Sequence, residues 1–194
     1  MILARGLGRT FGAKRVLRGL DLDVAERDML LVTGPNGSGK STLLALCAGL
    51  LAPTEGELEV GVERGRIGYL AHEPLVYREL SALENLDLYG RLYRVPERRE
   101  RIGMLLERFG LWESRRQPVS SFSRGMQQRL ALCRTLLHEP DLLLLDEPYA
   151  GLDEAGAELL DAELAGLSGE RTVVLATHEP DRAAHLAAGR LALT

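Results

Sequence analysis

The chain has 194 residues, which is enough for one well-buried core and short for two domains. Hydrophobic residues make up 45% of it and charged residues 27%, as in ordinary soluble globular proteins. The formal net charge of -4 argues against nucleic acid as the main partner, and no run approaches the ~20 apolar residues of a membrane span. The first residues lack the apolar run of a signal peptide. Cys47 and Cys133 form no metal-binding pattern and are expected to be buried thiols.

The first fifty residues contain the patterns of short strands and one helix. Residues 21–24 alternate like a half-buried strand, whereas residues 29–33 form the continuous apolar run of a central parallel strand. A helix is predicted over residues 40–50, because Gly49 and Pro53 close it. Residues 57–60 and 67–70 are further candidate strands.

The middle of the chain differs, because its apolar residues recur at helical spacing. Ser81 and Glu84 form a capping box that opens a helix ending near residue 93. The apolar residues 102, 105, 106 and 109 predict a second amphipathic helix. We therefore expect residues 74–120 to be a mostly helical insertion, not a separate domain behind a linker.

Strands and helices alternate again after residue 120. Ser123 is expected to cap a helix that runs to about residue 137, and residues 142–145 and 172–176 are candidate buried strands on either side of a helix over 154–167. This order predicts an α/β fold in three layers with parallel strands, as one domain over residues 1–194. Residues 1–73 and 121–194 would form its core around the helical insertion.

A glycine-rich loop stands between the apolar strand at 29–33 and the helix that follows. Its glycines let the backbone fold tightly and point N–H groups inward, and the helix adds the positive end of its dipole. Lys40 would reach the β- and γ-phosphates of ATP, and the Ser41 hydroxyl would bind Mg²⁺. An ordinary turn before a helix is the weaker alternative, because strand and helix flank the loop as the motif requires. The motif comprises Gly34, Pro35, Asn36, Gly37, Ser38, Gly39, Lys40 and Ser41.

Three polar residues follow the later strands. Asp146 and Glu147 end the four-leucine strand, where Asp146 suits Mg²⁺ and Glu147 can accept a proton from an attacking water. A solvated acidic turn is the alternative reading of this pair. His178 follows the strand 172–176 and could hydrogen-bond the γ-phosphate, although a lone histidine in such a place is more often structural.

Ser123 and Gly125 begin the helix upstream of the acidic strand. A serine and a glycine at a helix N-terminus form an anion site. The chain already has one phosphate loop, so a second anion site makes sense if it meets a nucleotide held by another copy. The alternative is an ordinary N-cap.

Together, in this order and spacing, these motifs resemble the nucleotide-binding domain of ABC transporters, over essentially the whole chain. Gly34 to Thr42 resembles the Walker A motif, and residues 142–147 resemble Walker B with its catalytic glutamate. Residues 150–153, ending at Asp153, look like the D-loop, and His178 looks like the switch histidine. The resemblance implies a RecA-like P-loop NTPase core with an antiparallel β edge and an inserted helical subdomain. It also implies ATP and Mg²⁺ as ligands.

Phe11 falls where the family places an aromatic that stacks on adenine, although a core phenylalanine is the alternative. The signature segment departs from the usual pattern, because Arg124 and Met126 replace a glycine and a glutamine. This form looks like that of ABC-2-type exporters. His72 stands where the family has the glutamine of the Q-loop, which leaves metal contact by this residue in question.

The stretches 69–74 and 79–86 are similar to the ATPase subunit of the cytochrome c maturation haem exporter, and the resemblance thus implies haem export. The expected assembly is a homodimer in which Ser123 and Gly125 of one copy complete the ATP site of the other. With no transmembrane run, the chain would act from the cytoplasmic face of the membrane, passing motion through residues 73–85 to a separate membrane subunit. The absent membrane subunits would select the substrate.

Rival interpretations are an ABC-2-type exporter ATPase for another substrate and a soluble ABC ATPase of DNA repair or translation. The latter typically carries coiled-coil inserts or tandem domains, and this chain has neither. A nucleotide-gated regulator without turnover is disfavoured by Glu147 and His178. A basic stretch could suggest nucleic acid, but it interleaves with Glu97 and Glu100 and is better interpreted as a solvated helix face. Its members are Arg91, Arg94, Arg98, Arg99 and Arg101.

Overall fold

The apolar runs of the sequence become neighbouring strands of a parallel sheet in the computed structural model, which describes residues 1–194. The sheet has five strands in the order β5-β6-β7-β3-β8, and every neighbouring pair is parallel. Strand β8 had no predicted counterpart, because its short sequence is mostly exposed and carries little periodic signal. The strands are β3 (Met29–Thr33), β5 (Ile67–Leu70), β6 (Leu142–Asp146), β7 (Thr172–Ala176) and β8 (Gly189–Ala192).

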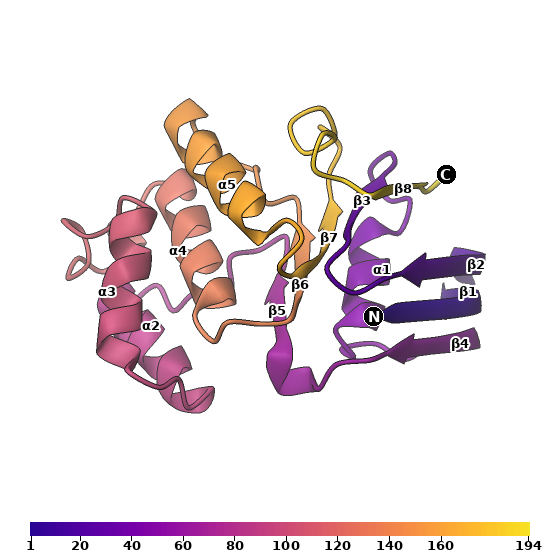
Figure 1. Ribbon diagram of the computed structural model, residues 1–194, viewed down its shortest axis with the longest axis horizontal. Helices are drawn as coiled ribbons and strands as arrows, with labels where there is room; N and C mark the ends of the chain where they lie inside the picture. The colour runs from indigo at the N-terminus through magenta and orange to yellow at the C-terminus, as the bar shows by residue number, and fades with distance from the viewer.

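A second, antiparallel sheet has the order β2-β1-β4 and lies at one end of the molecule (Figure 1). Its strands are β1 (Ile2–Phe11), β2 (Lys14–Val24) and β4 (Glu55–Val60). The expectation of short strands is wrong for β1 and β2, which have 10 and 11 residues, whereas β4 is short and contains the predicted strand at 57–60. Register shifts between Ala4 and Thr10 interrupt the alternation along β1, and Gly6 takes a positive φ of 58° there. These irregularities hid the strand from a period-two pattern.

Side chains of the parallel strands alternate between two hydrophobic cores. On one face, Leu30 and Leu144 pack with helix α1 (Lys40–Cys47) and the antiparallel sheet. On the other face, Leu31 and Leu145 pack with the remaining helices, which completes three layers. Those helices are α2 (Ala82–Leu92), α3 (Arg98–Arg108), α4 (Arg124–Leu136) and α5 (Glu154–Leu167).

Helix α1 ends at Cys47, so the predicted end at residue 50 is wrong. Gly49 takes a φ of 67°, and the Leu50 N–H donates to the Ala45 carbonyl at 2.9 Å. This left-handed turn satisfies a terminal carbonyl and stops the helix before its apolar pattern ends. Cys47 and Cys133 are both buried free thiols, as expected.

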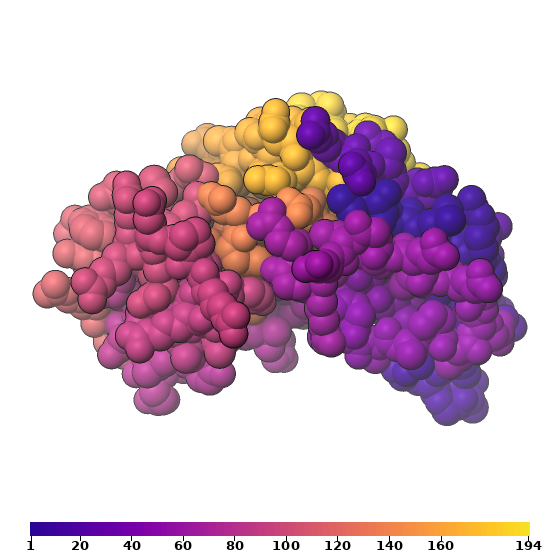
Figure 2. Space-filling view, turned by 60° about the horizontal axis from the view of Figure 1, so that its bottom comes forward, coloured from indigo at the N-terminus to yellow at the C-terminus, as the bar shows by residue number.

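Helices α2 and α3 lie between residues 74 and 120 and form a lobe at the end opposite the antiparallel sheet (Figure 1). The predicted capping box is present, since the Ser81 hydroxyl accepts from the Glu84 N–H and the Glu84 carboxylate accepts from the Ser81 N–H. Figure 2 shows a hollow between this helical lobe and the lobe that carries β4. None of the five helices combines the length and apolar character that a membrane span requires.

Candidate functional site

The glycine-rich loop connects the end of β3 to the start of α1, at the carboxyl edge of the parallel sheet. Gly34, Gly37 and Gly39 take φ values of 146°, 84° and 104°. Residues with a Cβ rarely adopt such angles, so the fold of this loop depends on glycine. At Gly39 an added Cβ would also lie 2.8 Å from Leu17 Cδ2. Strand β2 therefore packs directly beneath the loop.

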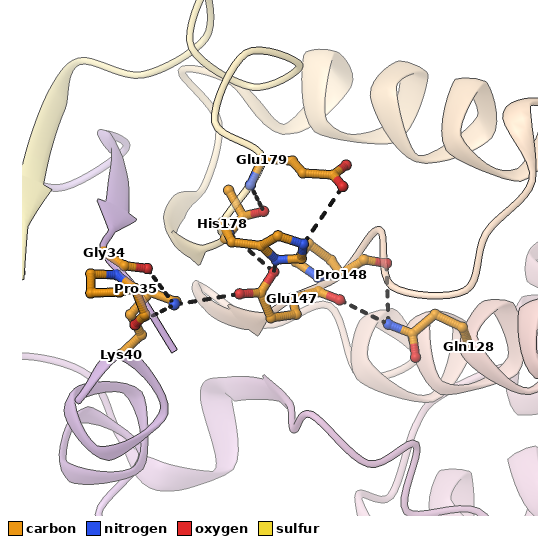
Figure 3. A network of polar contacts seen from close by, with 9 residues as sticks. Gly34, Pro35, Lys40, Gln128, Glu147, Pro148, His178 and Glu179 are labelled. Carbon is orange, nitrogen blue, oxygen red and sulfur yellow. Dashed lines mark hydrogen bonds and ion pairs between the residues drawn. The ribbon is translucent and has the colours of Figure 1, made fainter. Parts of the chain in front are cut away.

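Lys40 is buried, and its ammonium is directed back toward the loop. Nζ donates to the Gly34 carbonyl at 2.8 Å and to the Pro35 carbonyl at 3.4 Å, and it lies 3.6 Å from Glu147 Oε1 (Figure 3). The loop, α1 and the end of β6 thus meet around one positive charge. This places a fixed cation where the loop's N–H groups gather, as a phosphate-binding site requires.

A cavity of about 400 Å³ opens beside the loop and brings nine of the predicted site residues together, although His178 does not line it. Its walls come from the loop, the first turns of α1, the start of β2, the segment after β5 and the end of β6. Pro35 and Ser38 line a second cavity that the loop shares with β2 and residues 192–194. The first cavity is lined by Lys14, Val16, Asn36, Gly37, Gly39, Lys40, Ser41, Thr42, His72, Asp146 and Glu147.

Asp146 ends β6 and is almost fully buried, and neither of its carboxylate oxygens has a hydrogen-bond partner in the protein. Burial raises the pKa of this carboxyl, whereas the nearby Ser41 hydroxyl and the charge of His72 act in the opposite direction. An unpartnered, buried carboxylate beside a hydroxyl is a donor set that a hard cation such as Mg²⁺ satisfies. Ser41 and Asp146 therefore fit a magnesium ion.

Glu147 follows immediately and is held by several contacts (Figure 3). Its N–H donates to the Ala176 carbonyl at 2.8 Å, and its Oε2 accepts from the His178 N–H at 3.2 Å and lies 2.8 Å from His178 Nδ1. The Glu147 side chain is buried, whereas the His178 side chain is 56% exposed. The arrangement orients a carboxylate at the cavity. On the far side of the imidazole, His178 Nε2 lies 3.6 Å from Oε1 of Glu179, whose side chain is exposed.

His72 lies two residues beyond β5, is exposed and lines the same cavity as Asp146. Phe11 ends β1 with 43% of its surface exposed, so the alternative of a core phenylalanine is wrong. The guanidinium carbon of Arg9 lies 4.5 Å from the centre of the Phe11 ring. Phe11 does not line the cavity, although it stands close in the chain to Lys14 and Val16, which do.

The signature segment and the D-loop residue lie outside the cavity. Ser123 caps α4, where its hydroxyl accepts from the Met126 N–H at 3.2 Å, and Arg124 is exposed. Asp153 caps α5 by accepting from the Gly156 N–H at 2.9 Å. Within one chain, Ser123 therefore acts as an ordinary N-cap, as the alternative interpretation expected. An anion site at this helix end would have to face another molecule.

Three residues close to this site were not predicted from the sequence. Lys14 and Val16 line the cavity from β2, and a prediction of the β1–β2 hairpin would have pointed to them. The Gln128 amide is buried and contacts the backbone of Glu147. A polar side chain among the buried residues of α4 is the feature that could have pointed to it.

Comparison with known proteins gives a consistent result. Residues 17–150 match the family model described as ABC transporter. The chain is 40% identical to the daunorubicin resistance ATP-binding protein DrrA3 of Streptomyces coeruleorubidus, over 96% of this chain and 63% of that protein. It is 32% identical to the lantibiotic transport ATP-binding protein SrtF of Streptococcus pyogenes, over 96% of this chain and 84% of that protein.

A solved structure agrees with the fold throughout. The dimeric ATP-binding cassette MJ0796, in a post-hydrolysis state bound to ADP and Pi, superposes with a TM-score of 0.89. The match covers all of this chain and 94% of that one at 28% sequence identity. The parallel sheet, the antiparallel sheet and the helical insert are therefore features shared with a solved ATP-binding cassette.

Proposed function

The chain belongs to the ABC transporter family of ATP-binding domains, and from that premise we propose that it binds ATP and hydrolyses it to drive transport through a separate membrane subunit. The observation that carries this proposal is the meeting of three features at one sheet edge. They are the glycine loop with Lys40, the unpartnered carboxylate of Asp146, and the Glu147–His178 pair.

In the proposed mechanism, backbone N–H groups of residues 36–42 and the Lys40 ammonium bind the phosphates. Glu147 accepts a proton from the attacking water, and His178 contacts the γ-phosphate through the side of its ring that Glu147 does not hold. Ser41 and Asp146 would hold Mg²⁺, which offsets negative charge on the phosphates. Phe11 would stack on adenine with its free face, beyond Val16.

We assign the trans part of the site to a second copy of the chain. Ser123, Arg124, Gly125 and Met126 lie outside the cavity and start a helix, which suits contact with a nucleotide held by another protomer. Asp153 would lie in the same interface. The dimeric state of MJ0796 supports this assignment by analogy.

Docking to a membrane subunit is assigned to the segment 73–85, which follows His72. Leu75 and Tyr77 are 51% and 53% exposed there, and this apolar surface adjoins the cavity through the loop that carries His72. Such a location would connect nucleotide-dependent movement to a partner. It would place the chain at the cytoplasmic face of a membrane.

We propose that the chain serves an ABC-2-type exporter of another substrate and not a haem exporter. The Ser123–Met126 sequence supports the first, and the relatives named above concern daunorubicin resistance and lantibiotic transport. The similarity to the haem exporter subunit rests only on residues 69–74 and 79–86. Affinity purification from native membranes would identify the membrane subunit, and a loss of c-type cytochromes on deletion would favour haem export instead.

The test of the enzymatic proposal is Glu147→Gln, which keeps the size of the side chain and removes the base. We expect ATP affinity to stay within about 3-fold and turnover to fall by about 100-fold or more, as for loss of a general base. Binding of a fluorescent nucleotide and release of phosphate measure the two effects. Hydrolysis at the wild-type rate would exclude Glu147 as the base.

A further inference from the structure

Gln128 is a buried polar side chain that points at the segment after β6. It lies on α4 with only 3% of its surface exposed. Its Nε2 donates to the Pro148 carbonyl at 3.1 Å and lies 3.5 Å from the Glu147 carbonyl (Figure 3). A buried amide satisfied by two successive carbonyls fixes the position of both peptide groups.

The backbone that Gln128 holds is in an uncommon conformation. Glu147 has a φ of 50°, which is the left-handed region, although it is not a glycine. Such a residue persists only where its surroundings determine it, and it tends to occur at functional sites. Here the N–H is bonded to the Ala176 carbonyl, and the carbonyl also accepts from the Ala150 N–H at 3.0 Å. Gln128 supplies the restraint that comes from outside the segment's own sheet and turn.

A second contact joins the same helix to the same segment four residues further on. A Cβ added at Gly125 would lie 2.8 Å from the Gly151 carbonyl oxygen. A Cβ added at Gly151 would lie 2.9 Å from Arg124 Cγ. The first two turns of α4 therefore fit closely against residues 147–151, and the two parts cannot shift independently without breaking these contacts.

We propose that Gln128 is a positioning residue for ATP hydrolysis, which holds the left-handed backbone of Glu147 and so aims its carboxylate. The inference rests on the proposed role of Glu147 as the base. Gln128 does not line the nucleotide cavity, so it acts through Glu147 and not on the nucleotide. Its loss affects the chemical step, because a displacement on the order of 1 Å can lower a rate about 100-fold.

The experiment compares Gln128→Leu with the matched control Gln127→Leu. Gln127 is the next residue of α4, and its amide donates to the Phe122 carbonyl at 3.0 Å, away from Glu147. For Gln128→Leu we expect kcat to fall by about 10-fold to 100-fold while KM for ATP changes less than about 2-fold. The control keeps kcat within about 2-fold. A rise in KM that matches the loss in kcat/KM, or equal losses in both variants, would overturn the proposal.

The variant Gln128→Glu gives a second test, the pH dependence of kcat, which would not change if Gln128 only supported the fold. A carboxylate here has no donor for the two carbonyls, whereas its protonated form has an O–H. The kcat of this variant relative to wild type is expected to rise as pH falls from about 8 to about 6, because surrounding carbonyls favour the protonated acid. A ratio that does not change with pH contradicts a specific hydrogen bond.

Hydrogen exchange separates this proposal from the proposed function. Amide exchange within residues 147–152 is expected to be faster in Gln128→Leu than in Gln127→Leu, with the loop at 34–39 unchanged. Unchanged exchange in residues 147–152 would overturn the positioning role whether or not the protein hydrolyses ATP. If the wild type shows no hydrolysis, the function of Glu147 fails, and exchange still decides the role of Gln128.

Discussion

Replacing Asp146 by asparagine should make the nucleotide-free protein more stable and make its ATP complex less sensitive to magnesium. The carboxylate is buried and neither oxygen has a partner, which leaves the charge without compensation by hydrogen bonds. An unsatisfied buried group costs about 1–3 kcal/mol and more when charged. Lys40, His72 and Ser41 offset part of that cost, so we take about 1 kcal/mol as the gain on removing the charge.

In a domain of this size, that gain corresponds to a rise in Tm of about 2–4 °C. The pH dependence follows from the raised pKa of Asp146. The folded state binds this proton more tightly than the unfolded state, so the group's contribution to stability increases as pH falls. The difference in Tm between Asp146→Asn and wild type should therefore shrink on acidification, since the wild-type carboxyl then becomes neutral too.

Thermal melts with and without ATP, each in magnesium and in a chelator, measure both effects. ATP should raise the Tm of wild type more in magnesium than in the chelator, and this difference between the two conditions should be smaller in Asp146→Asn. Asp23→Asn is the control, because this carboxylate is 72% exposed and lies 4.0 Å from Arg5. A lower Tm for nucleotide-free Asp146→Asn, or a full magnesium effect in that variant, would refute the reasoning.

Two further changes test the loop and the helical lobe. Gly39→Ala should weaken ATP binding by about 10-fold or more, because a strained backbone costs of order 1–3 kcal/mol, and nucleotide titration measures this. Unchanged affinity would mean that the loop need not keep the φ of 104° seen at Gly39. Ser81→Ala removes the capping box of α2 and should lower stability by about 1 kcal/mol, seen in a melt. ATP affinity should stay the same in that variant, and a loss of affinity would show that the helical lobe shapes the nucleotide site.

The sequence predicted the parts of the fold that have a strong local cause. The runs at 29–33 and 172–176 match β3 and β7, because both strands are buried on two faces and read as continuous apolar stretches. Ser81 and Ser123 were correctly expected to start helices, since a cap is a local hydrogen bond. Strand β1 was missed, because its register shifts depend on pairing with β2 and β4.

In the candidate site, too, features with a local sequence pattern could be predicted, and features that depend on distant contacts could not. Lys40, Ser41, Asp146 and Glu147 could be predicted to lie together, because carboxyl ends of parallel strands meet at one edge of a sheet. The contact of Gln128 with Glu147 joins residues separated by a strand and a turn, and no local pattern encodes it. The left-handed φ of Glu147 could likewise not be predicted, because it depends on contacts from distant parts of the chain. The Glu147 N–H donates to the Ala176 carbonyl at the end of β7, and the Glu147 carbonyl is contacted by the Gln128 amide on α4.

These contacts also indicate which restraints on Glu147 must last through a turnover. Lys40 now divides its hydrogen bonds between the carbonyls of Gly34 and Pro35 and lies 3.6 Å from the Glu147 carboxylate. Phosphates that enter the loop would compete for this ammonium, because they carry more negative charge than a carbonyl. Glu147 would then lose its ion pair at the moment when its carboxylate must be aimed. The bonds to His178 and the Gln128 amide do not involve the phosphate loop, so they remain, and this is why a buried glutamine outside the cavity should affect kcat more than binding.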